Sequence, residues 1–336
     1  MTTSQTAAEV ASAAHTGGPL LTIDGLGVRF RTREATVQAV TDLDLTVRSG
    51  ELLAVVGESG CGKSVLAHAL LGLLPANAAV TGHAVLRQPD GGTVDLVGCG
   101  ERRLAAEIRG RRVGLVPQSP ATALTPVRTG RRLLEETLRA HGHTRATTRG
   151  AAERLATDVG LDPADLDRYP HELSGGMAQR LVTALALAPD PPLLIADEPT
   201  TGLDRPLVDH TLDLLRRRCD GGGAVVLITH DLAAAERVAD TVVVMYASRT
   251  VERQPARRLF AEPGHPYSAA LLDALPDRSF RPVPGHPPML TALPDGCAFV
   301  PRCGRATEIC RVQPSTTGYG AGVLACHHPL PSGAGS

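Results

Sequence analysis

The sequence predicts an α/β fold with a helical insertion and a small cysteine-rich C-terminal extension, and three observations lead to this prediction. Apolar runs of strand length are each followed by a segment with helical spacing. The stretch from about 121 to 188 is instead rich in Arg, Ala, Leu and Glu, which is typical of helices. Four of the seven cysteines lie between residues 297 and 326.

The composition is that of a globular protein without a membrane-spanning helix. The 336 residues carry a net charge of −1, so no overall basic field attracts nucleic acid. Aromatic residues make up only 2%, so Ala, Val and Leu must build the core. No apolar run approaches the roughly 18–20 residues that a membrane-spanning helix needs. Residues 1–19 lack the features of a signal peptide, and their Ala, Ser, Thr and Gly content predicts a disordered tail on a cytosolic protein.

The predicted elements follow one another in a regular order. "LLTIDGLGVRF" and "DLDLTVRSG" have apolar residues at strand spacing. "ELLAVVG" is a continuous apolar run, typical of a fully buried parallel strand, and a Gly-rich loop joins it to the predicted helix "KSVLAHALLGLL". "PPLLIADEP" and "GGGAVVLITHD" repeat the order of buried strand and helix. Near the C-terminus "GHPYSAALLDALP" predicts a short helix and "RPVPGHPPMLTALP" a Pro-rich linker.

The first chemical motif is a phosphate-binding loop, "GESGCGKS", which fits G-x-x-x-x-G-K-[ST] between a predicted strand and a predicted helix. Its backbone N–H groups and the helix N-terminus form an anion nest. Lys63 is expected to reach the β- and γ-phosphates of ATP and Ser64 to bind Mg²⁺. For Cys61, in the loop, the helix N-terminus predicts a lowered pKa. The predicted ATP-binding residues of this loop are Gly57, Glu58, Ser59, Gly60, Cys61, Gly62, Lys63, Ser64 and Val65.

The second motif is a hydrophobic strand that ends in two carboxylates, "LLIADEP". Asp197 is expected to hold Mg²⁺, and Glu198 to activate the water that attacks the γ-phosphorus. Such a pair means little by itself. Together with the phosphate loop upstream, it indicates nucleotide hydrolysis.

The third motif, "LSGGMAQR", begins a predicted helix in the helical region. Ser174 is suited to cap that helix, while Gly175 and Gly176 allow the backbone to approach a second phosphate-bearing ligand. A capped helix with a flexible entry is the simpler interpretation. One ATP does not need two anion sites from one chain, but two chains packed head to tail would use both.

With these three motifs the chain resembles the ATP-binding subunit of an ABC transporter, over residues 20–248. The resemblance implies a P-loop NTPase (RecA-like) core with a mixed sheet and an inserted helical subdomain at about 121–188. It matches Gln118 of "VPQ" to the residue that contacts Mg²⁺ and relays to the membrane subunit, and Asp204 of "TGLD" to the partner-facing loop. His230 of "ITHD" matches the switch histidine that positions the γ-phosphate, and is catalytic together with Glu198.

The resemblance also implies partners and a location. It implies transmembrane permease subunits, a second ATPase subunit that is identical or a sister chain, and an extracytoplasmic substrate-binding protein that acts indirectly, with no nucleic acid. The chain would then lie peripherally on the cytoplasmic face of the membrane. The aromatic residue that stacks on adenine is not settled, because Phe30 is a candidate and Val37 is an alternative at that position.

Further stretches resemble the dipeptide, oligopeptide and nickel importer branch. They are "PQSPATALTPVRTG", "VMYASRTVERQPARRLFAEPGHPYSAALLDALP" and the cysteine tail, within a C-terminal extension at 249–336. The substrate stays open among dipeptide, oligopeptide and nickel. The alternatives are a soluble ABC ATPase that acts on ribosomes or DNA, and a metal-sensing regulator of a transporter.

The four clustered cysteines are Cys297, Cys303, Cys310 and Cys326, with the spacing C-x5-C-x6-C-x15-C. The pattern lacks both the C-x2-C pairs of zinc fingers and the compact ferredoxin run. Disulfides are disfavoured in a reducing compartment. The irregular gaps and the resemblance favour a [4Fe–4S] cluster over Zn²⁺, while two disulfides or four free thiols are the remaining alternatives.

Overall fold

The structure is a computed structural model in which residues 18–331 are described, and the chain divides into two compact units. The first unit combines Met1–Cys99 with Thr229–Ser336, and the second is Gly100–Ile228. Most of the predicted N-terminal tail, residues 1–17, lies outside the described residues. Gly18 precedes the first strand, which begins at Pro19.

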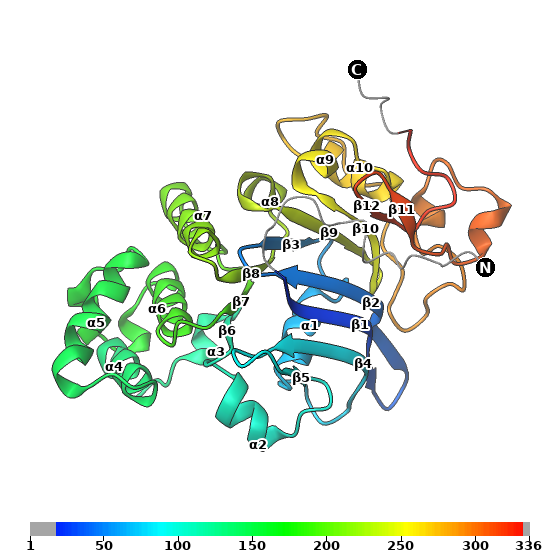
Figure 1. Cartoon of the computed structure of the whole chain (residues 1–336). Coiled ribbons are helices and arrows are strands. Elements are labelled where there is room, and N and C mark those ends of the chain that lie inside the picture. The colour runs from blue at the N-terminus through cyan, green and yellow to red at the C-terminus, as the bar shows by residue number, and fades with distance from the viewer. Residues whose placement is uncertain (1–17, 332–336) are drawn as a thin grey trace. The chain divides into compact units, whose positions relative to one another are not determined.

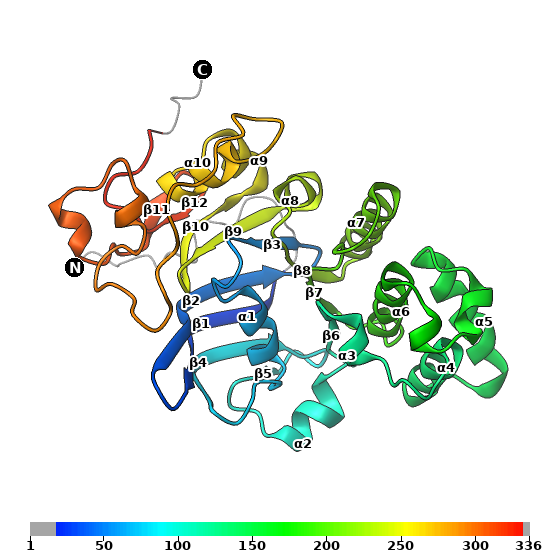
Figure 2. The ribbon, with the colours of Figure 1, turned by 180° about the vertical axis from the view of Figure 1, so that it is seen from behind.

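One sheet of the first unit is antiparallel throughout. Its order is β2 (Thr36–Arg48), β1 (Pro19–Arg31), β4 (Ala78–Arg87) and β5 (Thr93–Asp95). Helix α1 (Lys63–Leu70) lies against one face of this sheet, as the opposite views of Figures 1 and 2 show. The alternation of buried and exposed residues along β1 and β2 is that of strands with one face in the core.

The other strands of the first unit form a mixed arrangement. β3 (Leu52–Val56) pairs in parallel with β9 (Thr241–Tyr246), and all five side chains of β3 are buried, as predicted for a central strand. β9 pairs antiparallel with β10 (Arg249–Pro255). Two short strands near the C-terminus, β12 (Gly322–Leu324) and β11 (Thr317–Tyr319), continue the order beyond β10.

Three aromatic rings from distant parts of the chain pack together in the first unit. Tyr246 ends β9, and Tyr267 lies in helix α10 (Pro266–Asp273). Phe299 lies in the cysteine segment, which we define as residues 297–326. The Tyr246 ring centroid lies 4.4 Å from that of Tyr267 and 5.3 Å from that of Phe299. This cluster attaches the cysteine segment to the strands. The other helices of this part are α8 (Leu232–Val238), α9 (Ala256–Ala261), η4 (Val300–Arg302) and η5 (Glu308–Arg311).

The second unit has three parallel strands and most of the helices. β8 (Ala224–Ile228), β7 (Leu193–Asp197) and β6 (Val113–Val116) pair in that order, and every residue of β7 and β8 is buried. Helix α7 (Arg205–Asp220) packs against β8. The remaining helices are α2 (Glu101–Arg103), η1 (Leu104–Ile108), α3 (Pro120–Ala123), α4 (Gly130–Ala140), α5 (Arg145–Asp158), η2 (Pro163–Asp167), η3 (Pro170–Glu172) and α6 (Gly175–Leu187).

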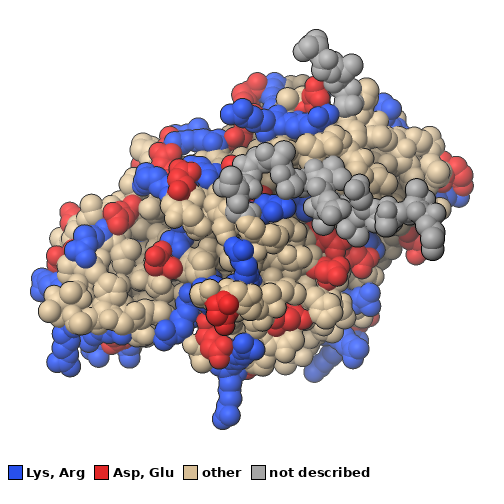
Figure 3. Space-filling model, in the orientation of Figure 1, with Lys and Arg blue, Asp and Glu red and all other residues tan. Residues whose placement is uncertain are grey.

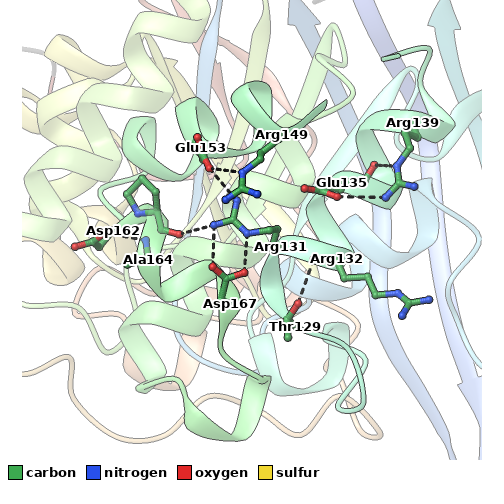
Figure 4. Close-up of polar contacts among 11 residues, drawn as sticks. Thr129, Arg131, Arg132, Glu135, Arg139, Arg149, Glu153, Asp162, Ala164 and Asp167 are labelled. Carbon is green, nitrogen blue, oxygen red and sulfur yellow. Dashed lines mark hydrogen bonds and ion pairs between the residues drawn. The ribbon is translucent and has the colours of Figure 1, made fainter. Parts of the chain in front are cut away.

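A polar network centred on Arg131 joins the helices of this region (Figure 4). Arg131 of α4 donates to both carboxylate oxygens of Asp167, at 2.6 and 3.0 Å, and to Glu153 of α5 at 3.1 Å. Arg149 also reaches Glu153, at 3.2 Å, and Asp162 caps η2. The network fixes α4, α5 and η2 relative to one another.

Charges of both signs are interspersed on the face drawn in Figure 3, where no large field of one sign stands out. Among the described residues, no helix has both the length and the apolar character needed to traverse a bilayer.

Candidate functional site

The phosphate loop lies between β3 and α1, as its motif predicted. Two of its glycines pass so close to other backbone segments that no side chain fits. A Cβ atom on Gly57 would lie 2.2 Å from the carbonyl oxygen of Met245, and one on Gly62 would lie 2.0 Å from that of Ala39. The glycines therefore hold the loop against β9 and β2, with its amides at the start of α1.

Lys63 points back into the loop. Its ammonium group donates to the carbonyl oxygens of Gly57 at 2.7 Å and Glu58 at 3.1 Å. The prediction for Cys61 is wrong, because burial raises the pKa of its thiol and the nearby Lys63 charge opposes this only in part. Cys61 is therefore no activated thiolate.

His230 is held next to the strand that leads into the phosphate loop. The N–H of Thr229 donates to the carbonyl oxygen of Val55 in β3 at 3.1 Å. Asp231, the next residue, caps α8 by accepting from the N–H of Ala234 at 3.0 Å. Because its two neighbours are anchored, His230 has a fixed position in the first unit, and its side chain is exposed.

In the second unit Asp197 ends β7, Glu198 follows it directly, and Gln118 lies two residues beyond the end of β6. Val116 of β6 lies opposite Ala196 of β7, which places all three residues at one edge. Asp197 and Glu198 are 2% and 6% exposed. Glu198 has a φ of 50°, and its N–H donates to the carbonyl oxygen of Ile228. A strained, buried carboxylate of this kind is common at functional sites.

The predicted partner-facing residues also lie in the second unit. The hydroxyl of Ser174 accepts from the N–H of Met177 at 3.3 Å, so Ser174 caps α6 as expected. Gly176 packs against Leu203, and a Cβ atom there would lie 3.2 Å from its side chain. Asp204, at the start of α7, follows directly. Ser174, Gly175 and Asp204 are exposed.

The predicted nucleotide residues thus form two sets. The phosphate loop and His230 belong to the first unit, and the carboxylates, Gln118 and the Ser-Gly-Gly helix belong to the second. Phe30 and Val37 face each other across β1 and β2, and both are half-buried. Their roles and those of the two sets toward ATP and Mg²⁺ stay predictions.

The four clustered cysteines line one small cavity in the first unit, together with His265 and Phe299. Its empty space, with the solvent at its mouth, is about 300 Å³. None of the four forms a disulfide bond among the described residues, contrary to the disulfide alternative. The N–H of Cys297 donates to the carbonyl oxygen of Cys310 at 2.9 Å, which ties the two turns that carry these thiols.

Burial raises the pKa of two of the thiols that line this cavity, Cys297 and Cys326. Burial raises the pKa of Cys326 to about 11, and Cys297, Cys303 and Cys310 add to the shift because they lie close by. Burial likewise raises the pKa of Cys297. Within residues 18–331, no group of three or more His, Cys, Asp or Glu side chains has the arrangement of a metal-ion site.

His265 adds a nitrogen to the lining of this cavity. It is 1% exposed, and burial lowers its pKa to about 3, so the ring is neutral at physiological pH. Its Nδ1 accepts from the N–H of Tyr267 at 3.0 Å, which leaves the ring proton on Nε2. Nε2 is buried and has no hydrogen-bond partner among the described residues.

Sequence reasoning missed the residues that join the cysteine segment to the phosphate loop. Arg302 forms a two-pronged ion pair with Glu58, and the Tyr267 hydroxyl accepts from the Glu58 N–H. Arg302 precedes Cys303 and Tyr267 lies in "GHPYSAALLDALP", but neither position in the sequence indicates a contact with Glu58.

Two family models match the chain. Residues 40–201 match the family "ABC transporter". Residues 251–310 match the family "Oligopeptide/dipeptide transporter, C-terminal region".

Similar proteins cover almost the whole chain. The oligopeptide transport ATP-binding protein OppD of Haemophilus influenzae is 40% identical over 315 residues, which are 91% of this chain and 96% of the relative. OppD of Salmonella typhimurium is 39% identical over 98% of this chain and 99% of its own length. A putative peptide import ATP-binding protein of Brucella melitensis is 42% identical over 87% of this chain and 91% of its own length.

Solved structures share the fold. The ATP-binding cassette MJ0796, in a dimeric post-hydrolysis state bound to ADP and Pi, matches with a TM-score of 0.63 at 23% identity, over 70% of this chain and 99% of that one. The CbiO1 protein of Clostridium perfringens matches with a TM-score of 0.59 at 24% identity, over 73% of this chain and 91% of that one.

Proposed function

The chain belongs to the ABC transporter family, in the branch of peptide-import ATP-binding proteins, and on this premise we propose that it hydrolyses ATP to energise the uptake of di- and oligopeptides. The observation that carries the proposal is the phosphate loop between β3 and α1, in a chain with about 40% identity to oligopeptide-transport ATPase subunits. No comparison favours the alternative of a ribosome- or DNA-directed ATPase.

Each motif has one role in the proposed reaction. The loop amides and Lys63 bind the phosphates, and Ser64, Gln118 and Asp197 serve Mg²⁺. Glu198 orients the attacking water and accepts its proton, and His230 positions the γ-phosphate. The burial and left-handed backbone of Glu198 support this role, because they fix the carboxylate in one direction.

We assign the Ser-Gly-Gly helix to the ATP of a second subunit, identical or sister. Support comes from the exposure of Ser174 and Gly175 at the start of α6, whose N-terminus favours an anion, and from the proximity of Gly176 to the loop before Asp204. ATP binding would then close two subunits around two nucleotides, and hydrolysis would release them.

The proposed partners are separate transmembrane permeases, with an extracytoplasmic binding protein that delivers the peptide. The chain would act as a peripheral subunit on the cytoplasmic face of the membrane. Peptide is favoured over nickel because the similar proteins carry oligopeptide or peptide import in their names. Loss of labelled-peptide uptake on deletion of the gene supports this substrate, and loss of nickel uptake alone contradicts it.

The catalytic assignment is tested by Glu198→Gln in the purified chain. We expect ATP hydrolysis to fall on the order of a hundredfold or more while ATP binding persists, because the variant loses only the base. Glu107→Gln is the matched control, since Glu107 is exposed and forms an ion pair with Arg103 on the surface. Hydrolysis by Glu198→Gln at the wild-type rate would refute the assignment.

We further propose that the cysteine cavity holds a [4Fe–4S] cluster, with Cys297, Cys303, Cys310 and Cys326 as its ligands. Four thiols that line one cavity suit the four corner irons of such a cluster, whereas one Zn²⁺ needs each ligand atom at roughly 2.3 Å from a single point. The buried Nε2 of His265 fits a donor to a cluster sulfur. When bound, the cluster would supply a one-electron redox centre.

The cluster is tested by anaerobic purification of the full chain, followed by analysis of iron, sulfide and zinc. We expect about four irons per chain and absorbance near about 400 nm. Both are lost in Cys303→Ser and kept in Cys99→Ser, because Cys99 is outside the cavity. One zinc per chain without colour would overturn the cluster in favour of a structural clip, and thiols without metal would overturn both.

A further inference from the structure

Two residues of the C-terminal extension (residues 249–336) bind Glu58, the second residue of the phosphate loop. Nη1 and Nη2 of Arg302 donate to the two carboxylate oxygens of Glu58 at 2.7 and 2.9 Å. The backbone N–H of Glu58 donates to the hydroxyl of Tyr267 at 2.9 Å. Side chain and backbone of Glu58 are therefore both bound by residues more than 200 positions away.

Arg302 is itself held rigidly. Its side chain is 2% exposed, and its Nε donates to the carbonyl oxygen of Pro284 at 2.6 Å. Its guanidinium lies over the rings of Tyr246 and Phe299, 5.6 and 5.7 Å from their centroids, where cation–π attraction adds to the ion pair. A buried guanidinium with these partners has one geometry, and the fork of Arg matches a carboxylate in a way that Lys does not.

Glu58 connects this clamp to the atoms that contact phosphate. Its carbonyl oxygen accepts from the Lys63 ammonium at 3.1 Å and from the N–H of Cys61 at 3.3 Å. The position of Glu58 therefore sets the curve of the loop and the place of the Lys63 ammonium.

We propose that Arg302 is a positioning residue for the phosphate loop, through which the C-terminal cysteine segment sets the affinity of this chain for ATP. The inference rests on the proposed role of the loop in ATP binding. It gives the cysteine segment a function at the nucleotide site, although the segment lies far from the phosphate loop in the sequence. Arg302 is joined to Cys303 by a peptide bond and to Glu58 by the ion pair, so a change in the cysteine cavity has a short path to the phosphate loop.

The test is a titration of the full chain with a fluorescent, non-hydrolysable ATP analogue. We expect Arg302→Gln to weaken binding about tenfold, equal to about 1.4 kcal/mol. Glu58→Gln should weaken it similarly, and the double variant should lose less than about twofold more, because both changes break one interaction. Arg311→Gln is the matched control, since Arg311 lies in the same segment and forms an exposed ion pair with Glu308.

Steady-state ATP hydrolysis gives a second readout that a general loss of structure would not produce. We expect Arg302→Gln to raise KM for ATP while kcat changes little, because ground-state binding is what the clamp supports. If Arg302→Gln does not fold, Glu58→Gln tests the same ion pair at its less buried partner, because the Glu58 side chain is more exposed than that of Arg302.

Failure of the inference and failure of the proposed function are distinguishable. If the wild-type chain binds the analogue, Lys63→Ala abolishes binding and Arg302→Gln binds as well as wild type, the inference is overturned and the function stands. Full additivity of Arg302→Gln and Glu58→Gln also overturns it. If the wild-type chain and Lys63→Ala both fail to bind, the proposed function itself is wrong.

Discussion

Two glycines of the phosphate loop make different demands on the backbone around them. Gly62 has a φ of 108°, and a Cβ atom there would lie 2.0 Å from the carbonyl oxygen of Ala39. Gly60 also has a positive φ, 81°, but a Cβ atom on it would meet nothing within 4 Å. A methyl group therefore adds only backbone strain at Gly60, and both strain and a backbone collision at Gly62.

We expect Gly62→Ala to lower the free energy of unfolding by about 3 kcal/mol or more, because a collision with the backbone of β2 adds to the left-handed strain. Gly60→Ala should cost about 1–2 kcal/mol, the price of left-handed backbone alone. Denaturant unfolding of both variants, followed by circular dichroism, measures the difference. Equal losses would show that the collision at Gly62 is relieved by an easy shift.

Residues whose chemistry is local were predictable, and those defined by distant partners were not. The spacing of the phosphate loop predicted its place between a strand and the helix that begins at Lys63, because the three are contiguous in the sequence. Arg302 and Glu58 are 244 positions apart, and no periodicity connects them. The pKa of Cys61 was predicted wrongly for the same reason, since the helix N-terminus is visible in the sequence and burial is not.

At the scale of elements, the second unit depends on polar contacts between helices as well as on its buried strands. Arg131 has a side chain that is 14% exposed and bonds to α5 and η2, whereas its neighbour Arg132 is 65% exposed and pairs with Glu136 within α4. The two arginines are consecutive residues of α4. Arg131 has its partners on other elements, whereas Arg132 pairs within its own helix.

We expect Arg131→Gln to increase hydrogen exchange across α4 and α5, because it removes the contacts that join α4 to α5 and η2. The free energy of local opening should fall by about 1–2 kcal/mol and no more, since solvent screens the partly exposed carboxylates. Arg132→Gln should change it by no more than a few tenths, as for an exposed pair within one helix. Mass-spectrometric exchange over residues 130–158 gives both values. Similar exchange in the two variants would mean that apolar packing alone holds these helices.

Elements with long apolar runs were also the predictable ones. β3, β7 and β8 were expected as buried strands, and all their side chains are buried. β11 and β12 were not predicted, because three residues each give no period, and they form only by pairing beside β10. An uninterrupted apolar run, rather than length, revealed β3, β7 and β8, since the ten-residue β4 has no such run and was not predicted.

At the scale of the whole molecule, one chain carries one phosphate loop, in the first unit, and one Ser-Gly-Gly helix, in the second. A symmetric pair of chains offers two of each. In the proposed head-to-tail arrangement every ATP would use the loop of one subunit and the helix of the other. The arrangement therefore predicts that two different inactive chains can rescue each other.

Lys63→Ala removes the loop lysine, and Ser174→Arg places a bulky cation at the start of α6, so each variant alone should lose ATP hydrolysis. In a mixed pair, one site combines both lesions, and the other combines the intact loop of the Ser174→Arg chain with the intact helix of the Lys63→Ala chain. Random pairing of equal amounts should then restore about a quarter of wild-type hydrolysis, since half of the pairs are mixed and each has one complete site out of two.

A mixture of Lys63→Ala with Glu198→Gln is the control. Both of its lesions disable a chain's own ATP site, which leaves no complete site in any pair. No recovery in the first mixture, with pairing verified by sedimentation, would mean that the sites are not shared between identical chains and that the partner is a sister ATPase.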